Sequence, residues 1–152
     1  MKREYIERGS YDFKTDFNVG YAAELELAEI LRKRPRVKTV THNDNNKYDL
    51  LVKTTSGDSY TLEVKADLKS EHTGNIVVEF ESRGKLSGIN TTESLYWFEK
   101  LGDNFWYLLT NDLKQLIADE KYSSIKEGGD EGTSKMYVFN MEYLKSQMNK
   151  FE

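Results

Sequence analysis

The chain has 152 residues, carries a formal net charge of −4, contains no cysteine and is 38% hydrophobic. This length fits a single domain with a sizeable core, and the lack of cysteine excludes disulfides, a thiol nucleophile and a cysteine-based zinc site. No apolar run reaches the ~20 residues of a membrane span and the N-terminus lacks the apolar middle of a signal peptide, so we expect a cytoplasmic protein with no membrane partner.

The first predicted element is a helix over residues 20–34, which follows a polar lead segment at residues 1–19 and ends at Pro35. Its apolar face contains Ala23, Leu27, Ile30 and Leu31. Glu24 falls near the middle of this face, where a carboxylate is costly unless a partner compensates it. The helix dipole also favours a glutamate near a helix start, which explains the position of Glu24 along the helix but not the face it occupies.

A cluster of basic residues follows at the end of this helix: Arg32, Lys33, Arg34, Arg36 and Lys38. Basic residues in the last turn of a helix are ordinary capping, but this cluster continues beyond the proline. Because the net charge is negative, a nucleic-acid-binding protein of this composition needs its cations gathered on one surface. The cluster is therefore the first candidate for phosphate contacts, with solvated helix-end charge as the alternative.

Three strands are predicted next. Residues 37–42 can form a first strand, and a turn of Asn and Asp residues leads from it into a hairpin. The hairpin strands are residues 48–52 and 60–64, which are rich in aliphatic, aromatic and β-branched side chains and are joined by a Ser-Gly-Asp turn.

Three charged residues of this hairpin are predicted to share one face. Side chains alternate along a strand, so Glu63 and Lys65 point one way and Leu62 and Val64 point the other way. Pairing of the two strands places Asp49 opposite Glu63 and Lys65, where cross-strand Cβ atoms lie about 4.5–5.5 Å apart. Two carboxylates and an ammonium there form a candidate site for a hard cation, although Glu-x-Lys alone is also a common solvated pattern.

The middle of the chain predicts a further strand and a helix. Residues 75–82 alternate as a half-buried strand, and Glu79 is a second-tier site candidate if this strand extends the same sheet; an exposed glutamate is the commoner explanation. Arg83 and Lys85 lie in an expected flexible loop that could contact a substrate backbone. Asn90 and Glu93 are spaced as a capping box.

That capping box predicts a helix over residues 91–102. Residues 104–110 are typical of a buried strand. A short helix through Ile117, a strand at residues 136–139 and a last helix that begins at Asn140 complete the predicted elements.

The two histidines, His42 and His72, lie in or near turns without metal-ligand spacing, so we interpret both as surface residues.

The ordered set Glu24, Asp49, Glu63 and Lys65 resembles the PD-(D/E)xK nuclease superfamily. Asp49 matches the lone Asp of that family and Glu63-Val64-Lys65 matches its (D/E)-x-K, whereas Tyr48 stands where the motif has its proline. In Holliday junction resolvases of this superfamily, a glutamate of the first helix reaches toward the metal site. Glu24 resembles that glutamate in its place on the first predicted helix. The stretch over residues 73–92 resembles small phage-type endonucleases of this group.

The resemblance implies a restriction-endonuclease-like α/β fold, with a mixed central sheet flanked by helices in the order helix-strand-strand-strand-helix-strand. Residues 20–117 would form this core, with residues 75–82 as an added strand. Residues 118–152 would be a C-terminal extension with the last helix, and the whole chain would be a single nuclease domain.

The same resemblance implies a metal-dependent endonuclease that hydrolyses phosphodiester bonds in DNA, with branched DNA as a narrower substrate class. Asp49, Glu63 and the backbone carbonyl of Val64 would hold Mg²⁺, with Mn²⁺ as a substitute, and Glu24 would complete the shell. Lys65 would orient the attacking water or neutralise developing charge. A non-catalytic nucleic-acid- or protein-binding module that retains this fold is the alternative, and the sequence leaves homodimer against monomer open.

Overall fold

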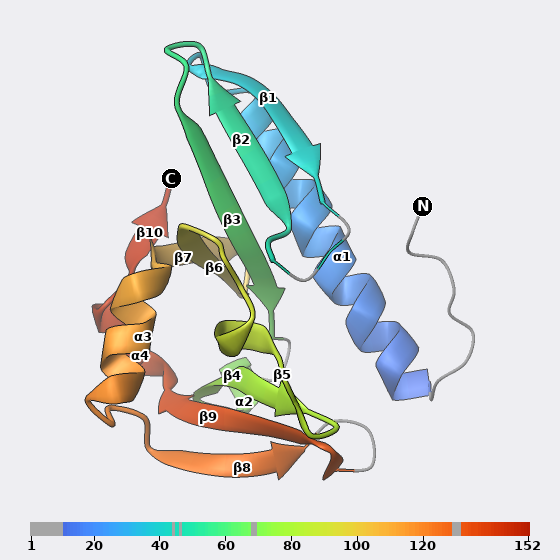
Figure 1. The fold of residues 1–152 in the computed structure, drawn as a ribbon, viewed down its shortest axis with the longest axis vertical. Helices are drawn as coiled ribbons and strands as arrows, with labels where there is room; N and C mark the ends of the chain where they lie inside the picture. The colour runs from blue at the N-terminus through green and yellow to red at the C-terminus, as the bar shows by residue number, and fades with distance from the viewer. Residues whose placement is uncertain (1–10, 44, 46, 68–69, 129–131) are drawn as a thin grey trace.

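The computed structural model describes residues 11–43, 45, 47–67, 70–128 and 132–152, and its strands form two sheets (Figure 1). The larger sheet has six strands in the order β1-β2-β3-β6-β7-β10, and the smaller has four in the order β5-β4-β9-β8. Strands β3 and β6 run parallel and their neighbours in the larger sheet pair antiparallel, so the expected α/β class with a mixed sheet is confirmed. No helix in the described part of the chain is long and apolar enough to cross a membrane.

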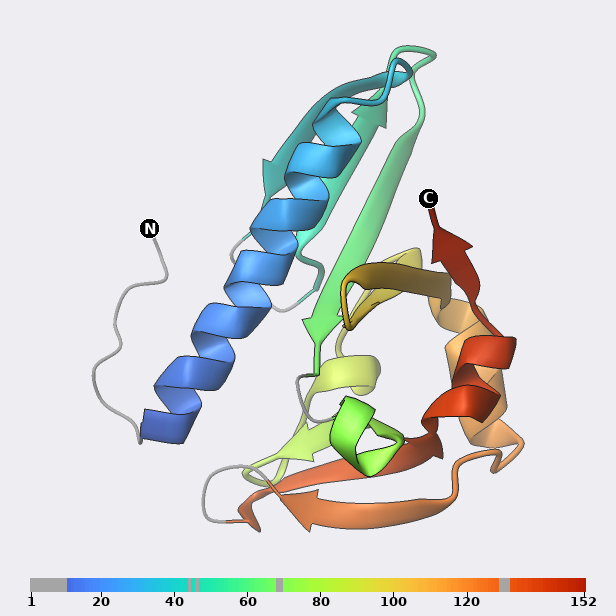
Figure 2. The same ribbon diagram turned by 180° about the vertical axis from the view of Figure 1, so that it is seen from behind.

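Helix α1 (Tyr11–Arg32) covers the larger sheet over β1 (Val37–His42), β2 (Leu50–Thr54) and β3 (Ser59–Ala66), as Figure 2 shows from the helix side. The core between them contains Ala23, Leu27, Ala28, Leu31, Val40, Leu50, Val52, Leu62 and Val64. The predicted helix was too short at its start, because residues 11–19 of the expected lead segment are helical. No proline interrupts them, and a glycine inside a helix costs only about 1 kcal/mol.

The predicted first strand and hairpin are confirmed. Strands β1 and β2 pair antiparallel, and β2 pairs with β3 so that Leu50 faces Leu62 and Val52 faces Tyr60. The hairpin turn is closed by a hydrogen bond from the Gly57 N–H to the Thr54 carbonyl. Gly57 has φ +96, a conformation that glycine adopts without steric cost.

The helix predicted over residues 91–102 is wrong, because this segment forms strand β6 (Tyr96–Leu101). Trp97 and Phe98 point to opposite faces of the sheet and both are buried, in different core clusters. A strand between two cores buries consecutive aromatic residues that a one-faced helix cannot bury. The Asn90 side of the expected capping box instead lies in the short 3-10 helix η1 (Gly88–Asn90).

The connection from β3 to β6 therefore differs from the expected order of elements. It contains the four-residue helix α2 (Ser70–Thr73), strands β4 (Asn75–Ser82) and β5 (Lys85–Leu86), and η1. The strand predicted at residues 75–82 is confirmed as β4, but it belongs to the smaller sheet and does not extend the sheet of Glu63.

A β-hairpin lies where the sequence predicted a loop after β4. Arg83 and Gly84 have φ +54 and +78, the pattern of a two-residue hairpin turn, and β4 and β5 pair on either side of them. The hairpin packs closely at Gly88, where an added Cβ would lie 2.0 Å from the Glu79 carbonyl oxygen. Glu79 itself accepts a hydrogen bond from the Ser87 hydroxyl at 2.7 Å, and so has a local structural partner.

The C-terminal elements contribute strands to both sheets. Strand β7 (Asn104–Leu109) is followed by α3 (Thr110–Ala118), β8 (Ser124–Gly128), β9 (Ser134–Asn140) and α4 (Met141–Ser146). The last strand, β10, pairs with β7 and forms an edge of the larger sheet.

A second core cluster lies between the two sheets and these last helices. It buries Ile76, Val78, Ile89, Trp97, Leu101, Leu108, Leu113, Phe139, Leu144 and Met148. Strand β10 (Asn149–Phe151) follows directly after this cluster. The start of the last helix is as predicted, since the Asn140 side chain accepts a hydrogen bond from the Tyr143 N–H at 2.9 Å.

Candidate active site

Glu63 and Lys65 lie on the face of β3 that is turned away from α1, as the alternation of the strand predicts. Leu62 and Val64 are buried in the α1 core, whereas the Lys65 Nζ lies 3.1 Å from the Glu63 Oε2. Glu63 is only 8% exposed. The carboxylate is therefore partly removed from water and has an ammonium as its direct partner.

Asp49 meets this pair from the start of β2. Its N–H donates to the Leu62 carbonyl at 2.9 Å, and its Oδ2 accepts the Val64 N–H at 2.8 Å. These two bonds attach Asp49 to the peptide groups on either side of Glu63. The predicted pairing of Asp49 with the Glu63–Lys65 region is confirmed.

The pKa of Asp49 is raised at this site. Burial raises the pKa of Asp49 to about 6, and the Glu63 charge acts in the same direction against the opposing effects of Lys65 and the Val64 N–H. Burial alone would lower the pKa of Lys65, but Glu63 and Asp49 outweigh it and raise that pKa above its usual value. Lys65 is therefore a fixed cation at neutral pH, able to orient groups or neutralise charge but not to accept a proton.

A chain of buried hydroxyls fixes the other oxygen of Glu63. The Thr92 hydroxyl lies 2.9 Å from Glu63 Oε1 and 3.0 Å from the Ser94 Oγ, which in turn lies 2.9 Å from the Thr110 hydroxyl. The sequence interpretation missed these residues because it assigned Thr92 and Ser94 to a helix. The signal that it overlooked is a run of hydroxyl side chains directly before an aromatic segment.

Glu24 is buried on the apolar face of α1, as predicted, and is 3% exposed. Its Oε2 lies 2.5 Å from the His42 Nδ1 at the end of β1, which explains how a carboxylate is tolerated there. The interpretation of His42 as a surface residue is wrong, because its side chain is only 25% exposed and its Nδ1 contacts the Glu24 carboxylate. The Glu24 charge also raises the pKa of Asp49, so the two carboxylates interact electrostatically.

Asp49 and Glu63 are two carboxylates of this site that could hold a small hard cation. Within the described residues, no three His, Asp or Glu side chains form a group that could hold a metal ion. Asp49 and Glu63 are two such donors, and Mg²⁺ typically takes one or two carboxylates while it keeps several waters. Burial and, after it, the Glu63 charge raise the pKa of Asp49, and a bound cation would favour the charged form of this carboxylate. The Val64 carbonyl and Glu24 stay predicted ligands.

The basic cluster lies far along the sheet from these carboxylates. The Arg36 carbonyl accepts the Thr55 N–H and Val37 pairs with Thr54, which places the cluster beside the β2–β3 turn, at the other end of β2 from Asp49. Lys33, Arg36 and Lys38 are exposed there.

Two members of the cluster have structural contacts. Arg32 donates to Glu29 and to the Val40 carbonyl at 2.9 and 2.8 Å. The Arg34 guanidinium lies 4.6 Å from the centre of the Phe151 ring and donates to the Glu152 carbonyl. In the smaller sheet, Arg83 and Lys85 are exposed at the β4–β5 turn. Phosphate binding by either basic region stays a prediction.

Glu99 is a buried carboxylate that the sequence interpretation missed. It is 1% exposed, lies beside Lys65 in the pairing of β3 with β6, and accepts a hydrogen bond from the Trp97 Nε1 at 2.9 Å. Burial raises its pKa to about 7, with Asp67 acting in the same direction and the Trp97 bond and Lys65 opposing it. Glu99 was missed because residues 91–102 were predicted to form a helix, in which Glu99 would not share a face with Glu63.

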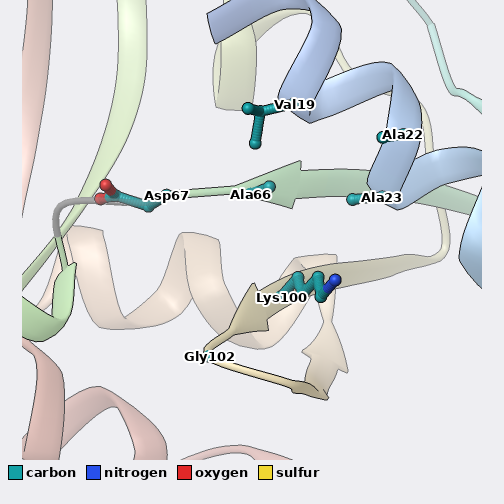
Figure 3. A pocket seen from close by; sticks show the side chains of 7 residues that line it. All are labelled: Val19, Ala22, Ala23, Ala66, Asp67, Lys100 and Gly102. Carbon is teal, nitrogen blue, oxygen red and sulfur yellow. The ribbon is translucent and has the colours of Figure 1, made fainter.

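A separate cavity of about 200 Å³ lies between α1 and the ends of β3 and β6 (Figure 3). Its lining residues are Val19, Ala22, Ala23, Ala66, Asp67, Lys100 and Gly102. Lys100 extends along one side and its ammonium pairs with Glu26. Glu24, Asp49, Glu63 and Lys65 do not line this cavity, so it is not the candidate active site.

Comparisons with protein-family models, with curated proteins and with solved structures found no match.

Proposed function

We propose that the chain is a metal-dependent DNA endonuclease that hydrolyses phosphodiester bonds. Its proposed active site contains Asp49, Glu63 and Lys65. The observation that supports this most directly is the charged face of β3, where Asp49 and Glu63 repel each other beside an ammonium 3.1 Å from Glu63. Two carboxylates that are partly buried and share one cation are suited to binding a second, divalent cation. Branched DNA is the narrower substrate that we propose.

Asp49 and Glu63 would hold Mg²⁺ or Mn²⁺, with the Val64 carbonyl and Glu24 as further ligands. The bound ion would supply Lewis-acid stabilisation of the phosphate oxygens and a more acidic water. Thr92 and Lys65 each contact one oxygen of Glu63 and so fix its carboxylate plane. Lys65 keeps its proton and stabilises the negative charge that grows on the phosphate.

Exposed basic residues in two places supply the proposed DNA contacts. Arg36 and Lys38, with Lys33, are exposed beside the β2–β3 turn, and Arg83 and Lys85 are exposed at the β4–β5 turn. Cations at such positions would bind the phosphate backbone without reading base sequence. The net charge of the chain is negative, so its proposed affinity for DNA must come from such local clusters of basic residues.

A non-catalytic nucleic-acid-binding module is the second candidate. It is favoured by the absence, within the described residues, of a group of three potential metal ligands. The same clusters of exposed cations would serve such a module, but Asp49, Glu63 and Lys65 would then have no function in it.

The test is a cleavage assay with Mg²⁺, Mn²⁺ or EDTA on duplex, single-stranded, flap and four-way-junction DNA. We expect metal-dependent cleavage by the wild type and none by Asp49→Ala or Glu63→Ala. Glu79→Ala is the matched control, because Glu79 is a half-buried strand carboxylate of the smaller sheet, and it should cleave at the wild-type rate. Binding without cleavage of any substrate would favour the module, and wild-type cleavage by Asp49→Ala would overturn the site.

A further inference from the structure

Four side chains form a compact block on the face of β3 and β6 that is turned away from α1. Glu63 faces Trp97 and Lys65 faces Glu99 in the parallel pairing of these strands. Each member contacts a neighbour: Lys65 pairs with Glu63 at 3.1 Å, and Trp97 donates to Glu99 at 2.9 Å. The block therefore joins the proposed active site to a carboxylate that has no part in it so far.

The Trp97 ring connects the two halves of the block. The Lys65 Nζ lies 5.6 Å from the centre of this ring, within the range in which an ammonium is attracted to an indole face. The indole N–H bond to Glu99 holds the ring in the orientation that presents this face to the Lys65 ammonium. Lys65 has a long flexible side chain that is 41% exposed, so contacts on two sides are needed to keep its ammonium in one place.

Burial of a carboxylate at the position of Glu99 is energetically unfavourable. It is 1% exposed in the middle of a sheet, and an apolar side chain of similar volume at such a position is often neutral or stabilising. What Glu99 adds over an apolar side chain is an acceptor for the Trp97 N–H, which a glutamine amide would also supply. Core stability alone therefore does not account for Glu99.

We propose that Glu99 is a positioning residue: it holds the Trp97 indole that supports the Lys65 ammonium, and so fixes Lys65 for the cleavage proposed above, on which this inference rests. Glu99 does not contact the substrate or the metal in this scheme. Its effect passes through a hydrogen bond to Trp97 and a ring contact to Lys65, in addition to the direct attraction between its charge and the Lys65 ammonium.

The kinetic test compares Glu99→Gln, which keeps an acceptor for the indole, with Glu99→Met, which removes it at similar length. We expect Glu99→Gln to stay within about threefold of the wild-type kcat, and Glu99→Met to lose roughly 10–100-fold in kcat with KM unchanged. In a Lys65→Ala background Glu99→Met should cause no further loss, because both changes act on the same ammonium. An equal loss in both backgrounds, or a wild-type kcat for Glu99→Met, would overturn the proposal.

The second test does not depend on cleavage. The side-chain ammonium of Lys65 is observed by nitrogen-15 NMR of protein labelled at lysine and is assigned by its loss in Lys65→Ala. We expect Glu99→Gln to keep the wild-type linewidth, with at most a shift from the lost charge, and Glu99→Met to broaden the resonance, since the ring no longer stays beneath the ammonium. Phe98→Leu is the matched control, because Phe98 is buried on the opposite face of β6 in the other core cluster, and the Lys65 resonance should be unchanged in this variant.

The two tests separate the two proposals. If the wild type cleaves no DNA, the proposed function fails, and the NMR comparison still decides whether Glu99 positions Lys65. If Glu99→Met does not fold, Trp97→Phe removes the same hydrogen bond from its donor side and carries the same expectation. A Lys65 resonance that is unchanged in the folded variant would overturn the inference even where cleavage is found.

Discussion

Glu24 on α1 and His42 at the end of β1 form a direct contact, with 2.5 Å between the carboxylate Oε2 and the imidazole Nδ1. The contact joins the helix to the edge strand of the larger sheet. It resolves the apparent conflict of a glutamate within an apolar helix face, because the buried carboxylate has a polar partner.

This contact predicts that Glu24→Gln destabilises the fold. The change keeps the shape of the side chain but removes the charge that His42 contacts, so we expect the free energy of unfolding to fall by about 1–3 kcal/mol. Denaturant titration measures it. The double variant with His42→Ala should be less destabilised than the sum of the single variants, because both remove one interaction.

Glu29→Gln is the control for Glu24→Gln, since Glu29 lies on the same helix and its side chain is 65% exposed. Its effect should stay within about 0.5 kcal/mol. Equal effects of the two changes would mean that the His42 contact adds nothing to stability. Cleavage by folded Glu24→Gln then reports whether Glu24 also serves the metal.

The sequence predicted the parts of the site that depend on local alternation. Glu63 and Lys65 had to share a face of β3 once the strand was recognised, and the short turn fixed the pairing that brings Asp49 to them. The burial of Glu24 followed from helical periodicity in the same way. Such features need only the residues within one element or one hairpin.

The features of the fold and of the site that the sequence did not predict depend on contacts between segments that are distant in the chain. The segment of Trp97 and Glu99 matched helix-start chemistry, and only its parallel pairing with β3 and burial on both faces make it a strand. The pairing of β4 with β9 involves residues more than fifty positions apart, as in Ile76 with Phe139, so periodicity could not show that β4 leaves the larger sheet. His42 was missed because its partner lies on another element.

The raised pKa of Asp49 predicts that the free energy of unfolding decreases as the pH rises. Between about pH 4 and pH 6 the folded protein keeps a proton on Asp49 that the unfolded chain has released. The folded state then binds more protons, so the free energy of unfolding falls as pH rises through this window, by at most about 3 kcal/mol at ~1.4 kcal/mol per pKa unit. Denaturant titrations from pH 4 to pH 8 measure the slope.

Asp49→Asn should flatten that slope between pH 4 and pH 6, because the amide does not titrate. Burial raises the pKa of Glu99 to about 7, so Glu99→Gln should flatten the part of the stability–pH slope that extends to about pH 7. The exposed Asp103→Asn is the control and should leave both parts unchanged. A wild-type slope in Asp49→Asn would contradict the assigned cause.

Mg²⁺ should stabilise the folded protein through Asp49 and Glu63. A ligand that binds only the folded state stabilises it by about 2.7 kcal/mol at one hundred times its Kd, so the melting temperature should rise with Mg²⁺ at constant ionic strength. Asp49→Asn and Glu63→Gln should abolish the rise, whereas Lys65→Ala should keep it. The rise should weaken below about pH 6, because protons compete for Asp49. An equal rise in all the variants would place the ion elsewhere.

The basic cluster after α1 should bind DNA phosphates through its exposed members, Arg36 and Lys38. Arg34 is unsuitable for this test, because its contacts with Phe151 and Glu152 support β10 and its reversal would disturb the sheet edge. Each phosphate that the protein neutralises contributes about −0.9 to the slope of log affinity against log salt on duplex DNA. Arg36→Glu with Lys38→Glu should therefore weaken binding to all sequences alike and flatten the slope by about one unit per lost contact.

The salt titration is made with Asp49→Ala protein, so that cleavage does not consume the DNA. Lys114→Glu with Lys121→Glu is the control: both lysines are exposed, on α3 and just after it, and their reversal changes the net charge by the same amount. If the control flattens the slope equally, net charge and not the cluster determines affinity. An unchanged slope in Arg36→Glu with Lys38→Glu would mean that the cluster is solvated helix-end charge, and that Arg83 and Lys85 of the smaller sheet must carry the phosphate contacts.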